Sequence, residues 1–420
     1  RVMRELGREE GEQGATVKLT IDSKIQNFAL ARMAGLSASA VVIDCESGDL
    51  LAVGSSPSFD PNLFVRGISN DNYNGLRDDI FGPLRAKAVQ GTYAPASTFK
   101  MMTALAALED RVLSPDDTIF CPGHFEISNN RFHCWKRQGH GVVNVADSII
   151  QSCDVFFYAI GQKVGIDKIS AMARRFGLGE HHDLPLSAVS RGVIPTRGWK
   201  QKSFDKSWLL GDTVNASIGQ GYVLASPLQL AVMAARLGTG RAVQPRLIQS
   251  INDAPLPLGA GAPLDVDPTH LAVVQKAMFG VANTKDGTAF STRIATQNLR
   301  MAGKTGTAQV RRITAGERVT GVIRNEDLPW KKRDHALFVD YAPHDNPKVA
   351  VAVVVEHGGG GSSVAAPIAR DITLFSLTGK MPDLDHYPSG LREKIRREQK
   401  ELAPKLIDWN SLKASRQTKT

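Results

Sequence analysis

Short apolar runs near both ends of the 420-residue chain predict the strands of a sheet. Residues 40–45 and 50–53 are rich in Val, Ile and Leu and flank the turn residues Glu-Ser-Gly-Asp at 46–49, which is the pattern of a β-hairpin. Further strands are expected at 303–312, 335–341 and 348–355. The segment joining the last two is rich in Pro, Asp and Asn and too short for a crossover helix, so we expect antiparallel pairing.

The middle of the chain instead repeats its apolar residues with the period of a helix. Helices are expected at 97–110, 144–163, 166–176 and 226–237, with a closing helix at 363–377. The fold class that follows is α/β of the mixed α+β kind. An antiparallel sheet, built from both ends of the chain and flanked by helices, would carry a large, mostly helical subdomain inserted between its strands.

The composition is that of a soluble globular protein. Hydrophobic residues make up 42% of the chain and charged residues 22%, which allows a sizeable core and excludes a disordered chain. No stretch approaches the ~18 consecutive apolar residues of a membrane-spanning helix. The sequence begins at Arg1 rather than at a methionine, so we expect a signal or a membrane anchor upstream of it.

The net charge of +9 is concentrated at the C-terminal end. Residues 391–420 hold nine Lys or Arg against four Asp or Glu, which is more than half of the excess. Such a tail is typical of a solvated chain end, or of a contact with a membrane surface or a partner. Aromatic residues are only 6% of the chain and are not interleaved with basic ones, so no nucleic-acid partner is expected. We expect residues 1–15 to be the end of a preceding region or a linker, with one main domain at 16–380 and a basic tail at 381–420.

Three short motifs that could carry chemistry follow one another along the chain. They are Ser97-Thr98-Phe99-Lys100, Ser152-Cys153-Asp154 and Lys304-Thr305-Gly306-Thr307. Taken singly the first two mean little, because Ser203-Phe204-Asp205-Lys206 is a second Ser-x-x-Lys and Ser128-Asn129-Asn130 is a rival for the second motif. Their order and their surroundings are what single them out.

The first motif has the context of an activated nucleophile. Ser97 stands where an apolar helix is expected to begin, and Lys100 lies one turn later on the same face. A serine hydroxyl becomes a nucleophile when a base takes its proton, and a buried lysine amine can act as that base. The stretch around Ser203 is polar and lacks this context.

The third motif falls on an expected strand. Alternation along the strand places Lys304 and Gly306 on one face, so that a cation stands beside a position without a side chain. This pattern suits a substrate backbone that lies along the strand with a carboxylate near Lys304. A phosphate-binding loop at Gly303-Lys304-Thr305 is excluded, because Asn298 occupies the position that needs a glycine.

The four cysteines raise the question of a metal. Cys121, Cys134, His140 and Cys153 could form a tetrahedral shell for a structural Zn²⁺, although their spacing is not that of a zinc ribbon. His124 and His133 are possible substitute ligands. Buried free thiols and a Cys121–Cys134 disulfide remain open alternatives. Cys45, in the middle of an apolar strand, is expected in the core.

The ordered trio resembles the penicillin-recognising serine transferases. Segments outside the motifs resemble class B penicillin-binding proteins: Gln90-Gly91-Thr92-Tyr93-Ala94-Pro95, Ile218-Gly219-Gln220-Gly221 and His335-Ala336-Leu337-Phe338-Val339. Others resemble the elongation-type, cell-shape branch: Phe156-Phe157-Tyr158, Trp199-Lys200-Gln201-Lys202, Gly211-Asp212-Thr213 and Gly280-Val281-Ala282-Asn283. The similarity covers roughly residues 16–380.

The resemblance implies the penicillin-binding transpeptidase fold and a role for each motif. Ser97 would be the acylated nucleophile and Lys100 its base, while Ser152 and Asp154 would pass protons and bind the donor peptide. Lys304, Thr305 and Thr307, with Gly306 between them, would hold the carboxylate of the substrate or antibiotic. The backbone N–H groups of Ser97 and Thr307 would form the oxyanion hole. Two residues depart from the commoner pattern: Asp154 stands where many relatives carry Asn, and Ala96 where Gly is commoner.

The resemblance also implies substrates, partners and a location. The substrates would be peptidoglycan stem peptides and the inhibitors β-lactam antibiotics, with no cofactor needed for acyl transfer. A SEDS-type glycan polymerase and the elongation machinery would be partners, at the inner membrane with this domain in the periplasm. It also favours zinc at Cys121, Cys134, His140 and Cys153. A D,D-carboxypeptidase of the same family and a non-catalytic zinc-containing scaffold are the alternatives, whereas the deacylating Glu loop of a β-lactamase is not found.

Overall fold

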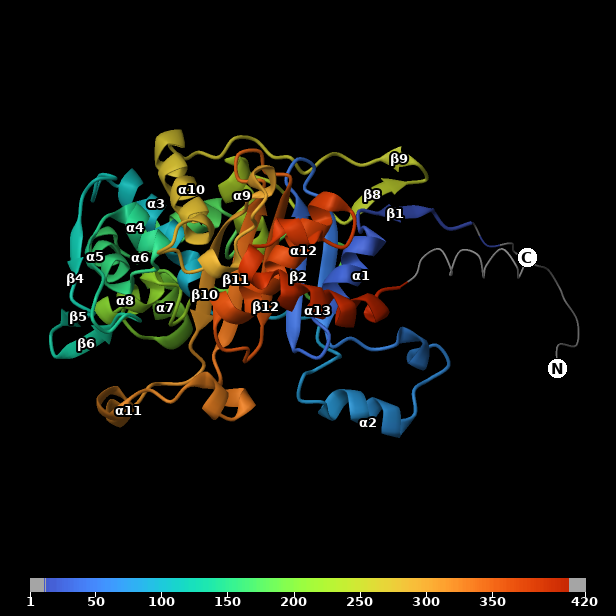
Figure 1. The fold of residues 1–420 in the computed structure, drawn as a ribbon, viewed down its shortest axis with the longest axis horizontal. Helices are drawn as coiled ribbons and strands as arrows, with labels where there is room; N and C mark the ends of the chain where they lie inside the picture. The colour runs from blue at the N-terminus through green and yellow to red at the C-terminus, as the bar shows by residue number, and fades with distance from the viewer. Residues whose placement is uncertain (1–10, 12, 408–420) are drawn as a thin grey trace, which may run out of the picture.

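A five-stranded antiparallel sheet forms the centre of the computed structural model, which describes residues 11 and 13–407 (Figure 1). Part of the expected linker (1–10 and 12) and the end of the expected basic tail (408–420) lie outside the described residues. The strands follow the order β10-β11-β12-β2-β3. Their bounds are β2 Ala38–Asp44, β3 Leu50–Ser56, β10 Ala302–Ala308, β11 His335–Ala342 and β12 Val349–Val355. The expected hairpin and the antiparallel pairing are confirmed, and β10 lies at an edge of the sheet.

Helices cover both faces of this sheet. On one face α1 (Ser23–Arg32) packs beside α12 (Ala366–Thr378), and Phe28 stacks on Phe375 with ring centroids 4.2 Å apart. On the other face α9 (Pro227–Thr239) lies against the central strands. Burial on both sides explains why β2, β11 and β12 read as almost continuous apolar runs instead of alternating patterns.

The chain between β3 and β10 forms the mostly helical subdomain, whose helices α3 to α8 lie at the left in Figure 1, whereas α2 lies at the lower right. Its helices beyond α9 are α2 Asn70–Asp78, α3 Lys100–Glu109, α4 Val145–Ile150, α5 Asp154–Val164, α6 Ile166–Arg175, α7 Arg197–Phe204, α8 Leu210–Ser217 and α10 Pro268–Asn283. Small strands complete it: β4 Ile119–Cys121, β5 His124–Ile127, β6 Asn130–His133 and β7 Gly141–Val143. Helix α3 is buried all around, from Lys100 to Leu108, which makes it the core of this subdomain.

The remaining elements lie at the periphery. They are β1 Val17–Leu19, β8 Ile248–Ile251, β9 Ala254–Pro255, α11 Ala315–Thr320 and α13 Arg392–Leu402. Helix α13 buries Ile395 and Leu402, which share a cavity with Phe28 of α1. Within the described part of the chain, no helix has the length and apolar character to cross a bilayer.

The mixed α+β fold class is confirmed, and two expected elements need correction. The helix expected at 144–163 is two helices, α4 and α5, because Ser152 adopts a left-handed conformation with φ 57° that a helix cannot continue through. The strand expected at 303–312 ends at Ala308, where β10 loses its partner β11. Helices α1, α2, α7, α8, α10, α11 and α13 are not among those the sequence predicts.

Candidate active site

The three motifs meet in one cavity of about 450 Å³ between strand β10 and the helical subdomain. The motif residues that line it are Ser97, Ser152, Asp154, Thr305 and Thr307. The first motif begins more than 50 residues before the second, and the second begins more than 150 residues before the third. The fold therefore brings three distant segments to one place. The fold explains the meeting, because α3 and α5 pack together and the turn before α3 packs on β10.

Ser97 is half-buried in a 3-10 turn, Ala96–Phe99, that leads directly into α3. Gly306 allows this turn to approach the sheet edge, since a Cβ atom there would lie only 3.1 Å from the carbonyl oxygen of Pro95 and from Thr98 Cγ2. Ala96 has φ 49°, in the left-handed region that favours glycine. The alanine that departs from the commoner sequence pattern therefore carries a local backbone strain of about 1 kcal/mol.

The amine of Lys100 is fully buried and connects the first motif to the second. Its Nζ donates to Asp154 Oδ1 at 2.7 Å, to the carbonyl oxygen of Ser152 at 2.9 Å and to Ser152 Oγ at 3.2 Å. Burial raises the pKa of the Asp154 carboxyl, and the Lys100 ammonium opposes that shift. The second motif is thus fixed to the first through one buried ion pair.

Lys304 lies behind the cavity wall rather than in it. Its Nζ is buried and donates to Ser152 Oγ at 3.0 Å and to the carbonyl oxygen of Thr305 at 3.2 Å. Burial and the nearby Lys100 lower the pKa of Lys304 well below its usual range. The Ser152 hydroxyl therefore bridges two lysine amines, while Thr305 and Thr307 are the third-motif side chains that line the cavity.

The Cys-His group lies directly behind the second motif. The donor atoms of Cys121, Cys134, His140 and Cys153 all lie within 4.8 Å of one another. The His140 Nδ1 atom is 3.6 Å from Cys121 Sγ and 3.5 Å from Cys134 Sγ. All four cysteines of the chain are free thiols, so a Cys121–Cys134 disulfide is not formed. His124 and His133 face each other across β5 and β6 and do not belong to the group.

Backbone contacts connect the Cys-His group to the cavity. The backbone N–H of Asp154 donates to Cys134 Sγ at 3.3 Å, and the N–H of Trp135 donates to Asp154 Oδ2 at 2.9 Å. The Trp135 indole Nε1 donates to the carbonyl oxygen of Ser152 at 3.0 Å. Cys153 points to the sulfur group while its neighbours Ser152 and Asp154 line the cavity.

Several cavity residues were not anticipated from the sequence. They are Trp135, Asn215, Thr288, Gln309, Asp334 and Ser362. Thr288 Oγ1 lies 2.8 Å from Thr305 Oγ1. Gln220, in a segment already noted for its resemblance, donates from Nε2 to the carbonyl oxygen of Thr307 at 3.3 Å. The unanticipated residues sit in loops or on single helix positions, where no short motif marks them.

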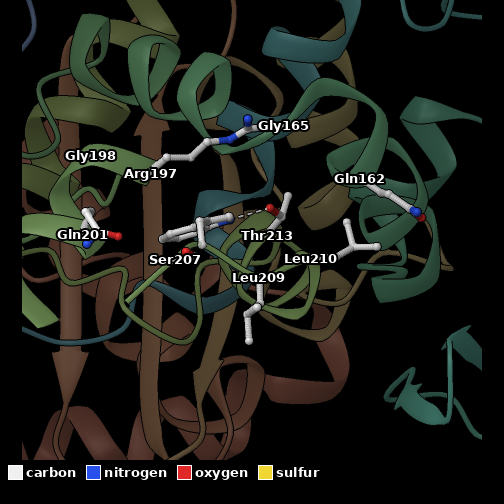
Figure 2. A pocket seen from close by; sticks show the side chains of 10 residues that line it. Gln162, Gly165, Arg197, Gly198, Gln201, Ser207, Leu209, Leu210 and Thr213 are labelled. Carbon is white, nitrogen blue, oxygen red and sulfur yellow. Dashed lines mark hydrogen bonds between the residues drawn. The ribbon is translucent and has the colours of Figure 1, made fainter. Parts of the chain in front are cut away.

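The rival motifs and a larger surface pocket lie elsewhere. Ser203 and Lys206 are exposed at the end of α7, and Ser128 is exposed in the turn between β5 and β6. A pocket of about 640 Å³ beside α7 and α8, shown in Figure 2, contains no motif residue. It is lined by Gln162, Gly165, Arg197, Gly198, Gln201, Ser207, Trp208, Leu209, Leu210 and Thr213. We therefore place the chemistry in the smaller cavity, where the motifs converge.

Comparisons with known proteins agree with this architecture. Residues 38–374 match the penicillin binding protein transpeptidase domain. The peptidoglycan D,D-transpeptidase MrdA of Haemophilus influenzae is 37% identical over 402 residues, which cover 94% of this chain and 61% of the relative. The chain thus spans about three fifths of the length of such curated relatives.

Solved structures show the same fold. The chain is similar to Pseudomonas aeruginosa PBP2, crystallised in complex with WCK 5153, with a TM-score of 0.78 and 37% identity over 91% of this chain and 80% of that one. It is also similar to PBP2 of Helicobacter pylori in its complex with MreC, with a TM-score of 0.77 and 33% identity over 87% of this chain and 64% of that one. The expected fold family is confirmed.

Proposed function

Because the chain belongs to the penicillin-binding protein transpeptidase family, we propose that it is a peptidoglycan D,D-transpeptidase that cross-links stem peptides through an acyl-enzyme on Ser97. The carrying observation is that Ser97 and Ser152 line one cavity at the edge of the sheet, while the amines of Lys100 and Lys304 lie behind it within hydrogen-bond distance of Ser152 Oγ. An edge strand such as β10 can pair with an extended peptide, which is the form a stem peptide would take.

The first half-reaction forms the ester. With the proton of the Lys100–Asp154 pair on the Asp154 carboxyl, the neutral Lys100 amine takes the Ser97 hydroxyl proton while Oγ attacks the carbonyl carbon between the two D-alanines. The N–H groups of Ser97 and Thr307 stabilise the oxyanion. The C–N bond then breaks, and the proton on Lys100 passes through Ser152 Oγ to the amine of the departing D-alanine. Ser152 suits this relay because its hydroxyl lies 3.2 Å from Lys100 Nζ.

The second half-reaction transfers the acyl group. A neutral amine of a neighbouring stem peptide attacks the ester carbonyl, a new C–N bond forms and the bond to Ser97 Oγ breaks. The proton that the amine loses returns by way of Ser152 and Lys100 to Ser97 Oγ, which restores the resting enzyme. β-Lactams would acylate Ser97 in the same manner, and nothing in the cavity resembles the glutamate loop with which a β-lactamase would hydrolyse the adduct.

Transpeptidation and carboxypeptidation share the first half-reaction and differ in the second. With a D-Ala-D-Ala donor peptide and an amine acceptor, we expect the full-length protein to release D-alanine and to form the amide product as the major fate of the acyl group. Mass spectrometry of the products separates the two fates. Free acid as the dominant product at saturating acceptor would instead favour the D,D-carboxypeptidase, and no D-alanine release would favour the non-catalytic scaffold.

The Cys-His group fits a structural Zn²⁺. Three thiol sulfurs and one imidazole nitrogen are a complete tetrahedral shell, and Zn–S and Zn–N bonds of about 2.3 and 2.0 Å place S and N about 3.5 Å apart. The spacings of 3.6 and 3.5 Å from His140 Nδ1 agree with that geometry. We propose that Cys121, Cys134, His140 and Cys153 hold zinc in a closed site, which supports the backbone of Ser152 and Asp154 and takes no part in the chemistry.

Loss of a zinc ligand is expected to lower stability and acylation together. C134S and H140A should each lose the metal, melt at least about 5 °C below wild type and acylate more slowly with penicillin, because the support behind the second motif is gone. Metal content by mass spectrometry, thermal melting and penicillin labelling measure the three effects. S97A should keep its metal and its melting temperature. Wild-type melting in both ligand variants would exclude the zinc site.

The cellular setting is the remaining part of the proposal. We propose that residues 16–380 form a transpeptidase domain in the periplasm, held at the inner membrane by an anchor N-terminal to this chain. Elongation and cell-shape maintenance would be its role, with a SEDS-type glycan polymerase and the elongation machinery as partners. The resemblance to elongation-type proteins and the Helicobacter pylori PBP2–MreC complex support this setting. Recovery of the full-length protein entirely in the soluble fraction would contradict it.

A further inference from the structure

We infer that a second pocket, beside the motif cavity, binds a phosphate or diphosphate group. Its volume is about 650 Å³, and it shares no lining residue with the cavity that contains Ser97. Its walls come from the segment 80–93, from the short turn Trp330–Lys332, and from the two ends of β11 and β12 at His335 and Glu356. The inference goes beyond the proposed function, because none of these residues takes part in acyl transfer.

Cations outnumber carboxylates on the pocket wall. Arg85, Lys87 and Lys331 line the pocket together with one acid, Glu356, which leaves an excess of two positive charges. Asp79 lies outside the pocket, where its Oδ1 accepts a backbone N–H at 2.8 Å. The pocket therefore attracts anions, and most strongly those that carry two negative charges.

The carboxylate of Glu356 already has its partners. This residue is 6% exposed and accepts hydrogen bonds from Ser37 Oγ at 2.5 Å, from Tyr93 Oη at 2.9 Å and from Arg85 Nη2 at 3.1 Å. The guanidinium of Arg85 is held by the same contact, so this acid and this arginine form one ion pair. The charges that remain for a ligand are those of the two lysines.

Lys87 is a buried cation for which the protein supplies no anion. It is 1% exposed, and its Nζ donates to the carbonyl oxygen of Gly82 at 3.0 Å. Within the described part of the chain, no carboxylate forms an ion pair with it. Burial lowers the pKa of Lys87, and the charge of Glu356 opposes the shift. An ammonium has three N–H donors, so a bound anion would satisfy the donors that the Gly82 carbonyl does not.

A histidine adds a neutral donor to the pocket wall. The rings of His335 and His357 lie 4.5 Å apart, and the backbone N–H of His357 donates to His335 Nδ1 at 2.9 Å. Burial and the nearby His357 lower the pKa of His335 to about 4, so its ring is neutral near pH 7. Because Nδ1 accepts a hydrogen bond, the single ring proton is on Nε2, which is a donor.

The kind of donor favours phosphate over carboxylate. A carboxylate is bound best by the planar fork of an arginine, and the fork of Arg85 is held by Glu356. The remaining donors are single groups, namely the ammonium groups of Lys87 and Lys331 and the imidazole N–H of His335. Such donors suit the tetrahedrally arranged oxygens of a phosphate, which carries close to two negative charges at pH 7. The ligand class is therefore a phosphate or diphosphate group, free or on the headgroup of a lipid.

The test measures the binding of inorganic pyrophosphate to the full-length protein by isothermal titration calorimetry, at about 0.15 M salt to screen weak surface contacts. We expect one saturable site with a Kd below about 1 mM. Succinate, a dicarboxylate, should bind at least about tenfold more weakly. Phosphatidylcholine vesicles that contain phosphatidic acid distinguish the two sources: displacement of pyrophosphate assigns the site to a lipid headgroup, and no displacement assigns it to a free phosphate.

Two neighbouring lysines provide a matched pair of variants. Lys331 and Lys332 are both exposed in the same short turn, but only Lys331 lines the pocket. K331E should weaken pyrophosphate binding by about 10–100-fold, the range of one charge-assisted hydrogen bond. K332E has the same net charge and should bind within about twofold of wild type. The comparison therefore removes the general attraction of a basic protein for anions.

Binding should not depend on the nucleophile. S97A should bind pyrophosphate as the wild type does, and K331E should keep the wild-type rate of penicillin labelling. No saturable binding by the wild type, equal binding of succinate, or equal weakening in K331E and K332E would overturn the inference. Each of these results leaves penicillin labelling of Ser97 unchanged, so the failure of this site is distinguishable from a failure of the proposed function.

Discussion

S97A is expected to lose penicillin acylation by about 10⁴–10⁶-fold, the largest effect of any single substitution in the chain. The hydroxyl of Ser97 is the group of the first motif that would form a bond to the substrate. Time-resolved labelling with a fluorescent penicillin measures the rate. Because Ser97 is half-buried and an alanine fits its place, the melting temperature should stay within about 2 °C of wild type.

The matched control for this variant is S203A. Ser203 belongs to the second Ser-x-x-Lys of the chain but is exposed at the end of α7, outside the cavity. We expect S203A to label at the wild-type rate. Near-normal labelling of S97A, or loss of labelling in S203A, would contradict the assignment of the nucleophile.

K100M is expected to lower the acylation rate by about 10²–10⁴-fold, the range that general base catalysis contributes. Methionine preserves most of the buried stem and removes the amine that would take the Ser97 proton. The same change leaves Asp154 buried without its cation, which should lower the free energy of unfolding by about 3–5 kcal/mol. Denaturant unfolding and penicillin labelling measure the two effects separately.

The double variant K100M/D154N distinguishes catalysis from stability. Replacing Asp154 by the neutral asparagine that many relatives carry removes the unpaired charge, so most of the lost stability should return. The acylation rate should remain low, because no base has been restored. If labelling recovers together with stability, Lys100 acts by holding the second motif in place and not as the base.

The three motifs were predictable from the sequence because each is short and local. Their order, and the helical context of Ser97, predict a single site, and the structure brings the three motifs together in one cavity. The predicted metal ligands Cys121, Cys134, His140 and Cys153 also meet, although their role as ligands stays a prediction. Local sequence is sufficient where a residue's role depends on its immediate neighbours.

Features that depend on distant contacts were not predictable. The residues around Ser152 continue the helical pattern of α4, and the break arises because Lys100 and Trp135 hold the Ser152 carbonyl from elsewhere in the chain. The alternation of side chains along the strand correctly placed Lys304 on the face opposite Thr305. It did not predict that Lys304 is buried behind Ser152. Asp334 follows a connection of more than 20 residues after β10, so no spacing indicates that it lies beside Gln309.

Some helices were missed although their local signals were present. Helix α1 begins after Asp22, whose side chain accepts from the N–H groups of Lys24 and Ile25. Helix α10 begins with the Asp267-Pro268 pair, which is a common start signal. One side of each helix packs on other elements and the rest is exposed to solvent. The polar residues on the exposed side weaken the apolar period that reveals buried helices such as α3.

Peptide mapping by mass spectrometry after exposure to benzylpenicillin tests the central claim most directly. The account predicts one covalent adduct per chain, on the proteolytic peptide that contains Ser97, and no adduct on the peptide that contains Ser203. An adduct at Ser203, or a chain that remains unmodified while a known penicillin-binding protein in the same experiment is labelled, would contradict it.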